Sequence, residues 1–148
     1  MGAVADAALA AGGRVTGVIP AQLAHHEVPH EGLTELCIVD SMHERKALMN
    51  ELSDAFVTLP GGFGTLDETF EALTWSQLGI HAKPIGLLNV EGYFDPLLTF
   101  LDHAANEGLL RKRDRSALLV AETVVELLNR LAGFEPPRGD RWIEQPRS

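Results

Sequence analysis

The chain has 148 residues, of which 45% are hydrophobic and 22% are charged, a composition typical of one globular domain and not of a disordered chain. Its 12 Lys and Arg residues face 21 Asp and Glu residues, and the resulting net charge of -9 disfavours broad binding to nucleic acid. No apolar run is long enough to cross a membrane, and the single cysteine, Cys37, cannot form an internal disulfide, so we expect a cytoplasmic protein that binds no membrane.

The first third of the chain alternates predicted helices with predicted strands. Residues 1–11 are rich in alanine and are followed by two glycines, which predicts a helix and its stop signal. Short apolar runs at 15–19 and 36–39 predict two strands. The polar stretch 21–32 between them is predicted to be irregular, and residues 42–53 are predicted to form a helix.

The same alternation continues to the end of the chain. The predicted elements are a strand over 55–59, a glycine-rich turn over 60–64, a helix over 66–78, a strand over 84–89, a helix over 94–107, a strand over 118–120 and a helix over 123–131. Uniformly apolar strands that alternate with helices predict a parallel sheet with helices on both faces. We therefore expect one α/β domain over 1–132 and an extended or disordered tail over 133–148.

The most informative segment is Phe56–Glu71, FVTLPGGFGTLDETFE, in which an apolar strand runs through a glycine-rich turn into a helix. Backbone amides and the helix dipole make such a junction suitable for an anion. The segment is neither a Walker A loop nor a GxGxxG fingerprint. A tight turn with no ligand is the alternative. We favour binding of a single phosphate by the amides of Gly61, Gly62 and Gly64 and the hydroxyl of Thr65.

Glu68 has two interpretations. Thr65 and Glu68 have the spacing of a capping box, in which the carboxylate reaches back to the Thr65 amide, and spacing alone favours this structural role. In the functional alternative, Glu68 lies just beyond the phosphate, where it stabilises positive charge at a sugar carbon or activates water.

The helix predicted over 42–53 contains a second candidate, Arg45. Its guanidinium either extends to solvent or binds an anion, and the spacing does not decide between them. Lys46 and His43 flank Arg45 and add positive charge. The remaining members of the helical stripe that holds Arg45 are apolar, namely Met42, Met49 and Leu52.

Other polar clusters give weaker signals. The polar stretch contains His25, His26, Glu27, His30 and Glu31. These residues lack the regular spacing of a metal site, so we predict no metal. The basic run 111–113 is predicted to be a solvated turn, and Cys37 a buried small residue in its strand.

Two motifs, SMHERKA at 41–47 and PGGFGTLDE at 60–68, resemble those of the Lonely Guy (LOG) family of cytokinin-activating phosphoribohydrolases, which are often labelled lysine decarboxylases. The resemblance covers residues 1 to about 131. It implies a Rossmann-like α/β fold, a homodimer or higher oligomer, and no cofactor. The implied reaction is hydrolysis of the N-glycosidic bond of an adenosine-type nucleoside 5′-monophosphate, which yields free base and ribose 5-phosphate.

The resemblance also assigns site residues. It implies that Arg45 and Glu68 are the catalytic pair. It further implies that the substrate and its phosphate are bound by Met42, Lys46, Gly61, Gly62, Gly64 and Thr65.

Two further expectations concern the extent of the chain and its function. The family normally begins with a strand, a helix and a second strand, and we expect this N-terminal part to be missing here. The alternative function is a non-catalytic nucleotide-binding or carrier protein of related fold, similar to molybdenum-cofactor carriers. A pyridoxal-phosphate decarboxylase is disfavoured, because Lys46, Lys83 and Lys112 lie in no convincing setting for a Schiff base.

Overall fold

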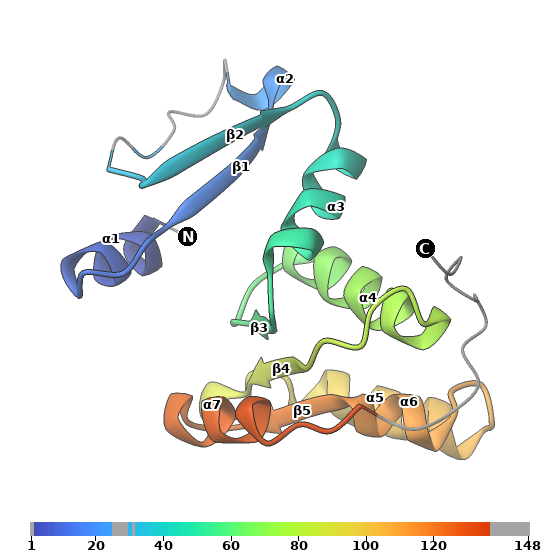
Figure 1. Ribbon diagram of the computed structural model, residues 1–148. Helices are drawn as coiled ribbons and strands as arrows, with labels where there is room; N and C mark the ends of the chain where they lie inside the picture. Colours follow the sequence, from blue (N-terminus) through green and yellow to red (C-terminus); the bar gives the residue numbers. More distant parts are fainter. Residues whose placement is uncertain (1, 25–29, 31, 137–148) are drawn as a thin grey trace. The chain divides into compact units, whose positions relative to one another are not determined.

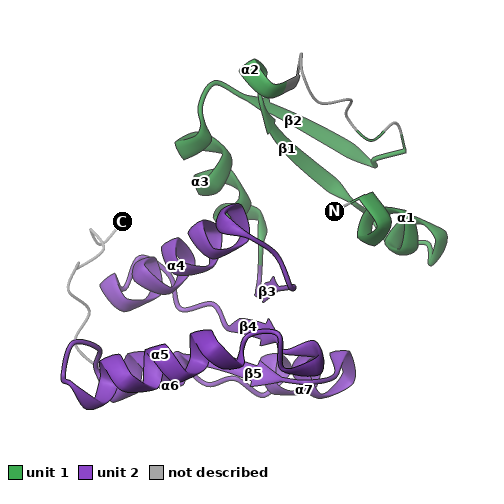
Figure 2. Ribbon diagram, turned by 180° about the vertical axis from the view of Figure 1, so that it is seen from behind, with its two compact units in different colours: residues 1–53 green, residues 54–148 purple. Residues whose placement is uncertain are grey.

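The computed structural model describes residues 2–24, 30 and 32–136 (Figure 1). The chain forms two compact units, residues 1–53 and residues 54–148, which are coloured separately in Figure 2. Unit 1 contains α1 (Gly2–Ala10), β1 (Thr16–Pro20), α2 (Ala21–Ala24), β2 (Glu35–Val39) and α3 (Met42–Leu52). Unit 2 contains β3 (Phe56–Thr58), α4 (Phe63–Leu78), β4 (Ile85–Leu88), the 3-10 turn η1 (Val90–Gly92), α5 (Asp95–Asn106), α6 (Lys112–Ala117), β5 (Leu118–Ala121) and α7 (Val124–Ala132).

Unit 1 is built on a parallel pair of strands. In the β1–β2 pair, Thr16 lies opposite Glu35, and α3 follows β2 after a short turn. The Ser41 side chain accepts a hydrogen bond from the Glu44 amide at 3.2 Å, while the Glu44 carboxylate accepts one from the Asp40 amide at 2.9 Å. These two bonds satisfy amides at the start of α3 and explain why the helix begins at Met42.

Unit 2 is built on a three-stranded parallel sheet in the order β3-β4-β5. Ile85 of the central strand lies between Phe56 of β3 and Leu118 of β5. All four residues of β4 are buried, as expected for a parallel strand covered on both faces.

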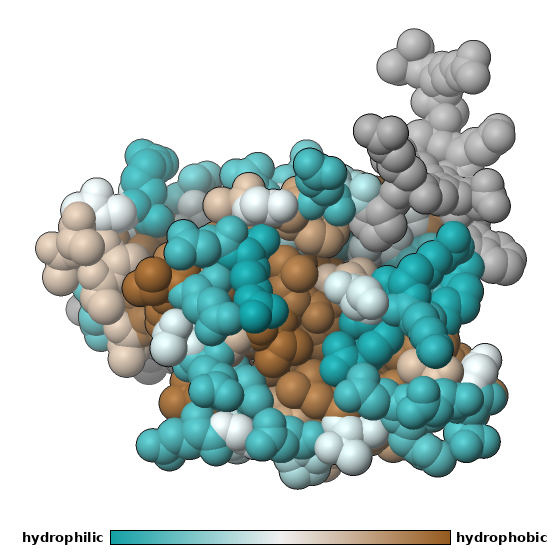
Figure 3. All heavy atoms as spheres, turned by 90° about the horizontal axis from the view of Figure 1, so that it is seen from below, coloured by the Kyte–Doolittle hydropathy of each residue, from teal (hydrophilic) through white to brown (hydrophobic). Residues whose placement is uncertain are grey.

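Burial differs between the two units. Among the described residues, Pro20 is the only buried one in unit 1, whereas the buried hydrophobic side chains lie in unit 2, from Ala72 to Leu131. Large apolar side chains are also exposed in both units, and the face drawn in Figure 3 shows apolar side chains among hydrophilic ones.

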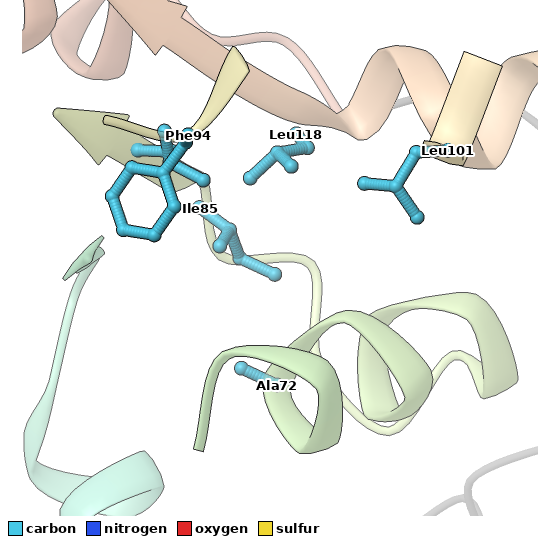
Figure 4. Close-up of a cluster of buried hydrophobic side chains, with 6 residues drawn as sticks. Ala72, Ile85, Phe94, Leu101 and Leu118 are labelled. Carbon is cyan, nitrogen blue, oxygen red and sulfur yellow. The ribbon is translucent and has the colours of Figure 1, made fainter. Parts of the chain in front are cut away.

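Two clusters fill the core of unit 2, one on each face of its sheet. Ile85 and Leu87 of β4 pack in the cluster with α4 and α5, of which Figure 4 labels Ala72, Ile85, Phe94, Leu101 and Leu118. On the other face, Leu88 and Ala121 pack with two leucines of α7. A side chain at Gly86 would come within 2.8 Å of Leu127, so the glycine lets α7 pack directly on β4.

The α/β class predicted from the sequence is confirmed: all five strands are present, they pair in parallel, and helices cover both faces of the β3-β4-β5 sheet. The described strands form two hydrogen-bonded sheets, β1-β2 and β3-β4-β5. The single domain over 1–132 stays a prediction. Residues 134–136 of the expected tail form neither helix nor strand, and 137–148 lie outside the described residues.

Three predictions of secondary structure were wrong. The stretch 21–32 contains the short helix α2, and the basic run at 111–113 leads into α6 where a solvated turn was expected. In this segment Arg111 pairs with Asp114 at 2.6 Å, an ion pair across one helical turn that helps form α6. Finally, α4 begins at Phe63, three residues earlier than predicted.

Candidate phosphate-binding junction and its neighbours

The junction between β3 and α4 is an unusual helix start. Gly62 is the N-cap residue of this 16-residue helix, and it makes no side-chain cap hydrogen bond. The amides of the first three helical residues, Phe63, Gly64 and Thr65, have no acceptor within the helix because the chain has not yet completed a turn. These amides and the positive end of the helix dipole lie at the glycine-rich turn, which gives the local chemistry needed to bind an anion.

The capping-box interpretation of Thr65 and Glu68 is wrong. Thr65 is the third residue of α4, and the amide of Leu66 already donates to the Gly62 carbonyl at 3.1 Å. Since the cap is Gly62, Thr65 is not in the position from which a capping box starts. Glu68 is half-buried in the second turn of α4, and its functional interpretation stays a prediction.

The three glycines of the turn have different surroundings. A Cβ on Gly61 would lie 2.1 Å from the Thr65 hydroxyl oxygen, so no side chain fits there without displacing Thr65. A Cβ on Gly62 or Gly64 would meet nothing within 4 Å, and neither residue has a positive φ. Packing against Thr65 therefore explains Gly61, whereas open space beside Gly62 and Gly64 suits close approach of a ligand to the backbone.

A chain of buried hydroxyls fixes the start of α4 to the end of β3. The hydroxyl of Thr69 donates to the Thr65 carbonyl at 2.6 Å. Its one proton is thus used, so the 2.9 Å contact between Thr58 and Thr69 has Thr58 as donor. This pair was not predicted from the sequence. The sequence features that could have indicated it are a threonine at the end of an apolar strand and another threonine in the following helix.

The loop after β4 contacts the glycine-rich turn. Asn89, buried at the end of β4, accepts from the Phe94 amide at 2.7 Å and donates to Asp95 at 2.8 Å. Tyr93 lies between Asn89 and Phe94 in the chain, and its hydroxyl donates to the Gly61 carbonyl at 3.0 Å. Neither Asn89 nor Tyr93 was identified from the sequence, because their relation to the turn depends on the pairing of β3 with β4.

The predicted site residues of α3 lie in unit 1. Arg45 is half-buried, and its Nε donates to the Val18 carbonyl of β1 at 3.2 Å. From the sequence we expected the guanidinium to reach either solvent or an anion. The structure shows a further partner, the backbone carbonyl of Val18. Lys46 is half-buried, and the Met42 side chain is exposed. The structure thus groups the predicted site residues as Met42, Arg45 and Lys46 on α3, and Gly61, Gly62, Gly64, Thr65 and Glu68 at the β3–α4 junction.

His81 is a buried titratable group that joins α4 to the segment before β4. Its Nε2 contacts the Ala72 carbonyl at 3.0 Å, and its Nδ1 accepts from the Lys83 amide at 3.2 Å. These partners define a neutral ring protonated at Nε2. Burial lowers the pKa of His81, the Lys83 charge lowers it further, and the hydrogen bond to Ala72 opposes this shift.

Metal-ligating side chains do not gather in the described part of the chain: no group of three His, Cys, Asp or Glu residues there could hold a metal ion. His30 contacts Asp6 at 2.7 Å, while His25, His26, Glu27 and Glu31 lie outside the described residues.

Cys37, expected to be buried, is half-buried. No helix in the described part has the length and apolar character of a membrane span.

Comparison with known proteins identifies relatives over most of the chain. A protein family described as "Possible lysine decarboxylase" matches residues 1–131. The cytokinin riboside 5′-monophosphate phosphoribohydrolase of Rhodococcoides fascians is 54% identical over 125 residues, which cover 84% of this chain and 63% of the relative. The enzyme of that name called LOG2 in Arabidopsis thaliana is 45% identical over 140 residues, covering 95% of this chain and 66% of the relative.

A third relative, the cytokinin riboside 5′-monophosphate phosphoribohydrolase LOG of Oryza sativa subsp. japonica, is 48% identical over 136 residues. This match covers 92% of the chain and 56% of the relative. The chain therefore spans about 56 to 66% of the length of these curated relatives.

Proposed function

The chain belongs to the Lonely Guy (LOG) family, and from this premise we propose that it is a nucleoside 5′-monophosphate phosphoribohydrolase. It hydrolyses the N-glycosidic bond of a cytokinin or related adenosine-type monophosphate and releases the free base and ribose 5-phosphate. The observation that carries this proposal is the β3–α4 junction, where uncapped amides, two glycines open to a ligand and Thr65 lie one turn before an acid.

The phosphate group is the part of the substrate that the junction suits best. The amides of Gly62 and Gly64 and the hydroxyl of Thr65 donate to a phosphate, and the dipole of α4 favours its negative charge. In a chain with a net charge of -9, such local donors are needed, because the overall field repels a dianion. Binding energy from the phosphate then orients the ribose for reaction.

Glu68 is the proposed catalytic carboxylate. It lies three residues after Thr65, about 4.5 Å along the helix axis. Cleavage of the glycosidic bond leaves positive charge on the anomeric carbon and its ring oxygen, and a fixed carboxylate stabilises this charge. The bonding electron pair leaves with the base, the water oxygen bonds to the anomeric carbon, and one water proton is taken up by the departing base.

Residues of α3 complete the proposed site. Arg45 holds Glu68 or the substrate oxygens through charge-assisted hydrogen bonds, while Met42 and Lys46 line the nucleotide site. The family motif at 41–47 supports these roles, and the bond from Arg45 to Val18 at 3.2 Å restricts the orientation of the guanidinium within unit 1.

The wider proposal concerns assembly and location. We propose that the active protein is a cytoplasmic homodimer and that residues 1–132 act as one Rossmann-like domain. The support is the family membership, the parallel α/β architecture and the single cysteine.

The test measures, by chromatography, the release of free base from AMP and from isopentenyladenosine monophosphate. We expect Glu68→Gln to lower kcat by about 100- to 10,000-fold, because the amide cannot stabilise positive charge, and Arg45→Ala to reduce turnover as well. Glu71→Gln, which makes the same chemical change one turn further along α4, is the matched control and should retain activity.

Two outcomes would contradict the proposal. Wild-type turnover in both the Glu68 and Arg45 variants would show that the site is misassigned. Saturable nucleotide binding by the wild-type protein without any release of base would instead support the non-catalytic carrier.

A further inference from the structure

We propose that Tyr93 is a positioning residue that sets the direction of the phosphate-binding amide of Gly62. This inference rests on the proposed function, since it concerns the same phosphate site. Its basis is the hydrogen bond from the Tyr93 hydroxyl to the Gly61 carbonyl at 3.0 Å, which joins residues 32 positions apart in the chain.

Peptide geometry connects this contact to the phosphate site. The carbonyl of Gly61 and the amide of Gly62 belong to one peptide unit, which is planar and trans, so the two groups point in opposite directions. When Tyr93 holds the carbonyl on its own side, the Gly62 amide points away from Tyr93. One hydrogen bond thereby fixes the donor at the N-cap of α4.

A peptide between two glycines needs such an anchor. Glycine has no Cβ to restrict φ and ψ, so the Gly61–Gly62 peptide can rotate into orientations that other residues disfavour. The Gly62 side of this peptide is also open, since a Cβ at Gly62 would meet nothing within 4 Å. Packing around Gly62 therefore does not hold the amide direction, whereas the bond from Tyr93 does.

Neighbouring residues fix the position of Tyr93. The next residue, Phe94, is 3% exposed in the core, and its amide donates to the buried Asn89 at 2.7 Å. The rings of Tyr93 and Phe94 pack edge to face with centroids 4.9 Å apart. The chain enters this position through Glu91 and Gly92, both with positive φ, so the turn is sharply defined.

The exposure of Tyr93 argues against a purely structural role. Tyr93 is 53% exposed, so its ring contributes little to the buried core, whereas the next residue, Phe94, is buried there. The feature that distinguishes tyrosine from phenylalanine here is the hydroxyl and its bond to Gly61.

Tyr93→Phe tests this role because it removes only the hydroxyl. We expect the KM for a nucleoside 5′-monophosphate to rise about three- to tenfold, the effect of losing one hydrogen bond. We expect kcat to remain within about twofold, because the other donors of the junction still orient the bound phosphate and the lost contribution is one that ground state and transition state share. Thr99→Val, which removes an exposed hydroxyl from α5, is the matched control and should leave both constants unchanged.

A spectroscopic measurement separates this inference from the proposed function. Tyr93 is the only tyrosine of the chain, so protein labelled with carbon-13 at the phenol carbon gives one tyrosine signal. We expect ribose 5-phosphate and inorganic phosphate to shift this signal saturably, and ribose to leave it unchanged, because the phosphate binds to the amide that Tyr93 orients.

The two readouts fail independently. Absence of base release by the wild-type protein would overturn the proposed function, whereas a tyrosine signal that ribose 5-phosphate does not move would overturn the role of Tyr93. In an active protein, an unchanged KM in Tyr93→Phe, or a loss confined to kcat, would also overturn the role of Tyr93 and leave the function standing. If Tyr93→Phe folds poorly, the wild-type signal still decides the question.

Discussion

At the scale of single residues, the glycine-rich turn uses one residue type for different physical reasons. Gly61 is required by the fold, because any side chain would collide with Thr65. Gly64 lies inside the first turn of α4, has open space beside it and no positive φ. In a helix, glycine is less stable than alanine by roughly 0.5–1 kcal/mol, so the fold alone would favour alanine at position 64.

Gly64→Ala should therefore change stability and binding in opposite directions. We expect the free energy of unfolding to rise by about 0.5–1 kcal/mol, because alanine favours the helix. We expect the KM for the monophosphate to rise several-fold at the same time, because the new methyl group occupies space that the phosphate needs. Thermal denaturation and steady-state kinetics on the same preparation measure both effects.

Thr74→Ala provides the control for helix propensity. Thr74 is exposed on α4, ten residues after Gly64 and about 15 Å along the axis. This change should leave KM unaltered. If Gly64→Ala is as active as Thr74→Ala, the backbone at position 64 does not approach the substrate.

At the scale of secondary-structure elements, His81 links α4 to the segment that leads into β4. Its two ring nitrogens contact Ala72 and Lys83, and its ring lies 5.4 Å from that of Phe56 in β3. The bond from the Lys83 amide requires an unprotonated Nδ1 and is therefore present only with the neutral ring. The link between these elements therefore depends on pH.

The sign of this dependence follows from the lowered pKa of His81. In the unfolded chain the ring titrates near its ordinary pKa of 6.5, whereas the folded protein keeps it neutral to lower pH. Below pH 6.5 the unfolded state thus binds more protons, and the free energy of unfolding falls as pH decreases toward the pKa of the folded state. Above pH 6.5 the contribution of His81 is fully present.

His81→Gln should reveal this contribution in chemical denaturation at several pH values. We expect the variant to be less stable than the wild-type protein by about 1 kcal/mol at pH 7.5, and this difference to shrink as pH falls below 6.5. His103→Gln on the exposed face of α5 is the control. A stability difference that stays constant between pH 7.5 and 5.5 would show that His81 does not titrate as described.

At the scale of the whole molecule, buried apolar contact is concentrated in unit 2. Its central strand β4 is buried along its full length, and the clusters on its two faces hold the buried leucines of α5 and α7. The β1-β2 pair of unit 1 has one fully buried residue among those described, Pro20. Elements with few buried apolar contacts open with a smaller free energy than core strands do.

Hydrogen exchange measured by mass spectrometry should therefore distinguish the strands of unit 2 from those of unit 1. We expect amides of β4 and β5 to exchange only through global unfolding, and amides of β1 and β2 to exchange earlier through partial opening. Leu127→Ala, which creates a cavity against β4, should lower stability by about 2–5 kcal/mol and speed exchange in unit 2. Equal protection of β2 and β4 would contradict this division.

The sequence by itself determined the features that are local in the chain. Apolar runs and helical spacing gave the five strands and the long helices, and the β3–α4 junction could be identified from consecutive residues. The motifs at 41–47 and 60–68 also identified the family. These features are readable because periodicity, glycine and turn chemistry act over a few neighbouring positions.

Only the tertiary structure decided the contacts that shape the junction. The bond from Tyr93 to Gly61 spans 32 positions, and the hydroxyl pair of Thr58 and Thr69 spans 11. The cap at Gly62, which excluded the capping box, is set by the geometry at which the chain leaves β3. Such contacts depend on which strands pair and in what register. The spacing of residues along one strand or helix does not show which strand will be its neighbour.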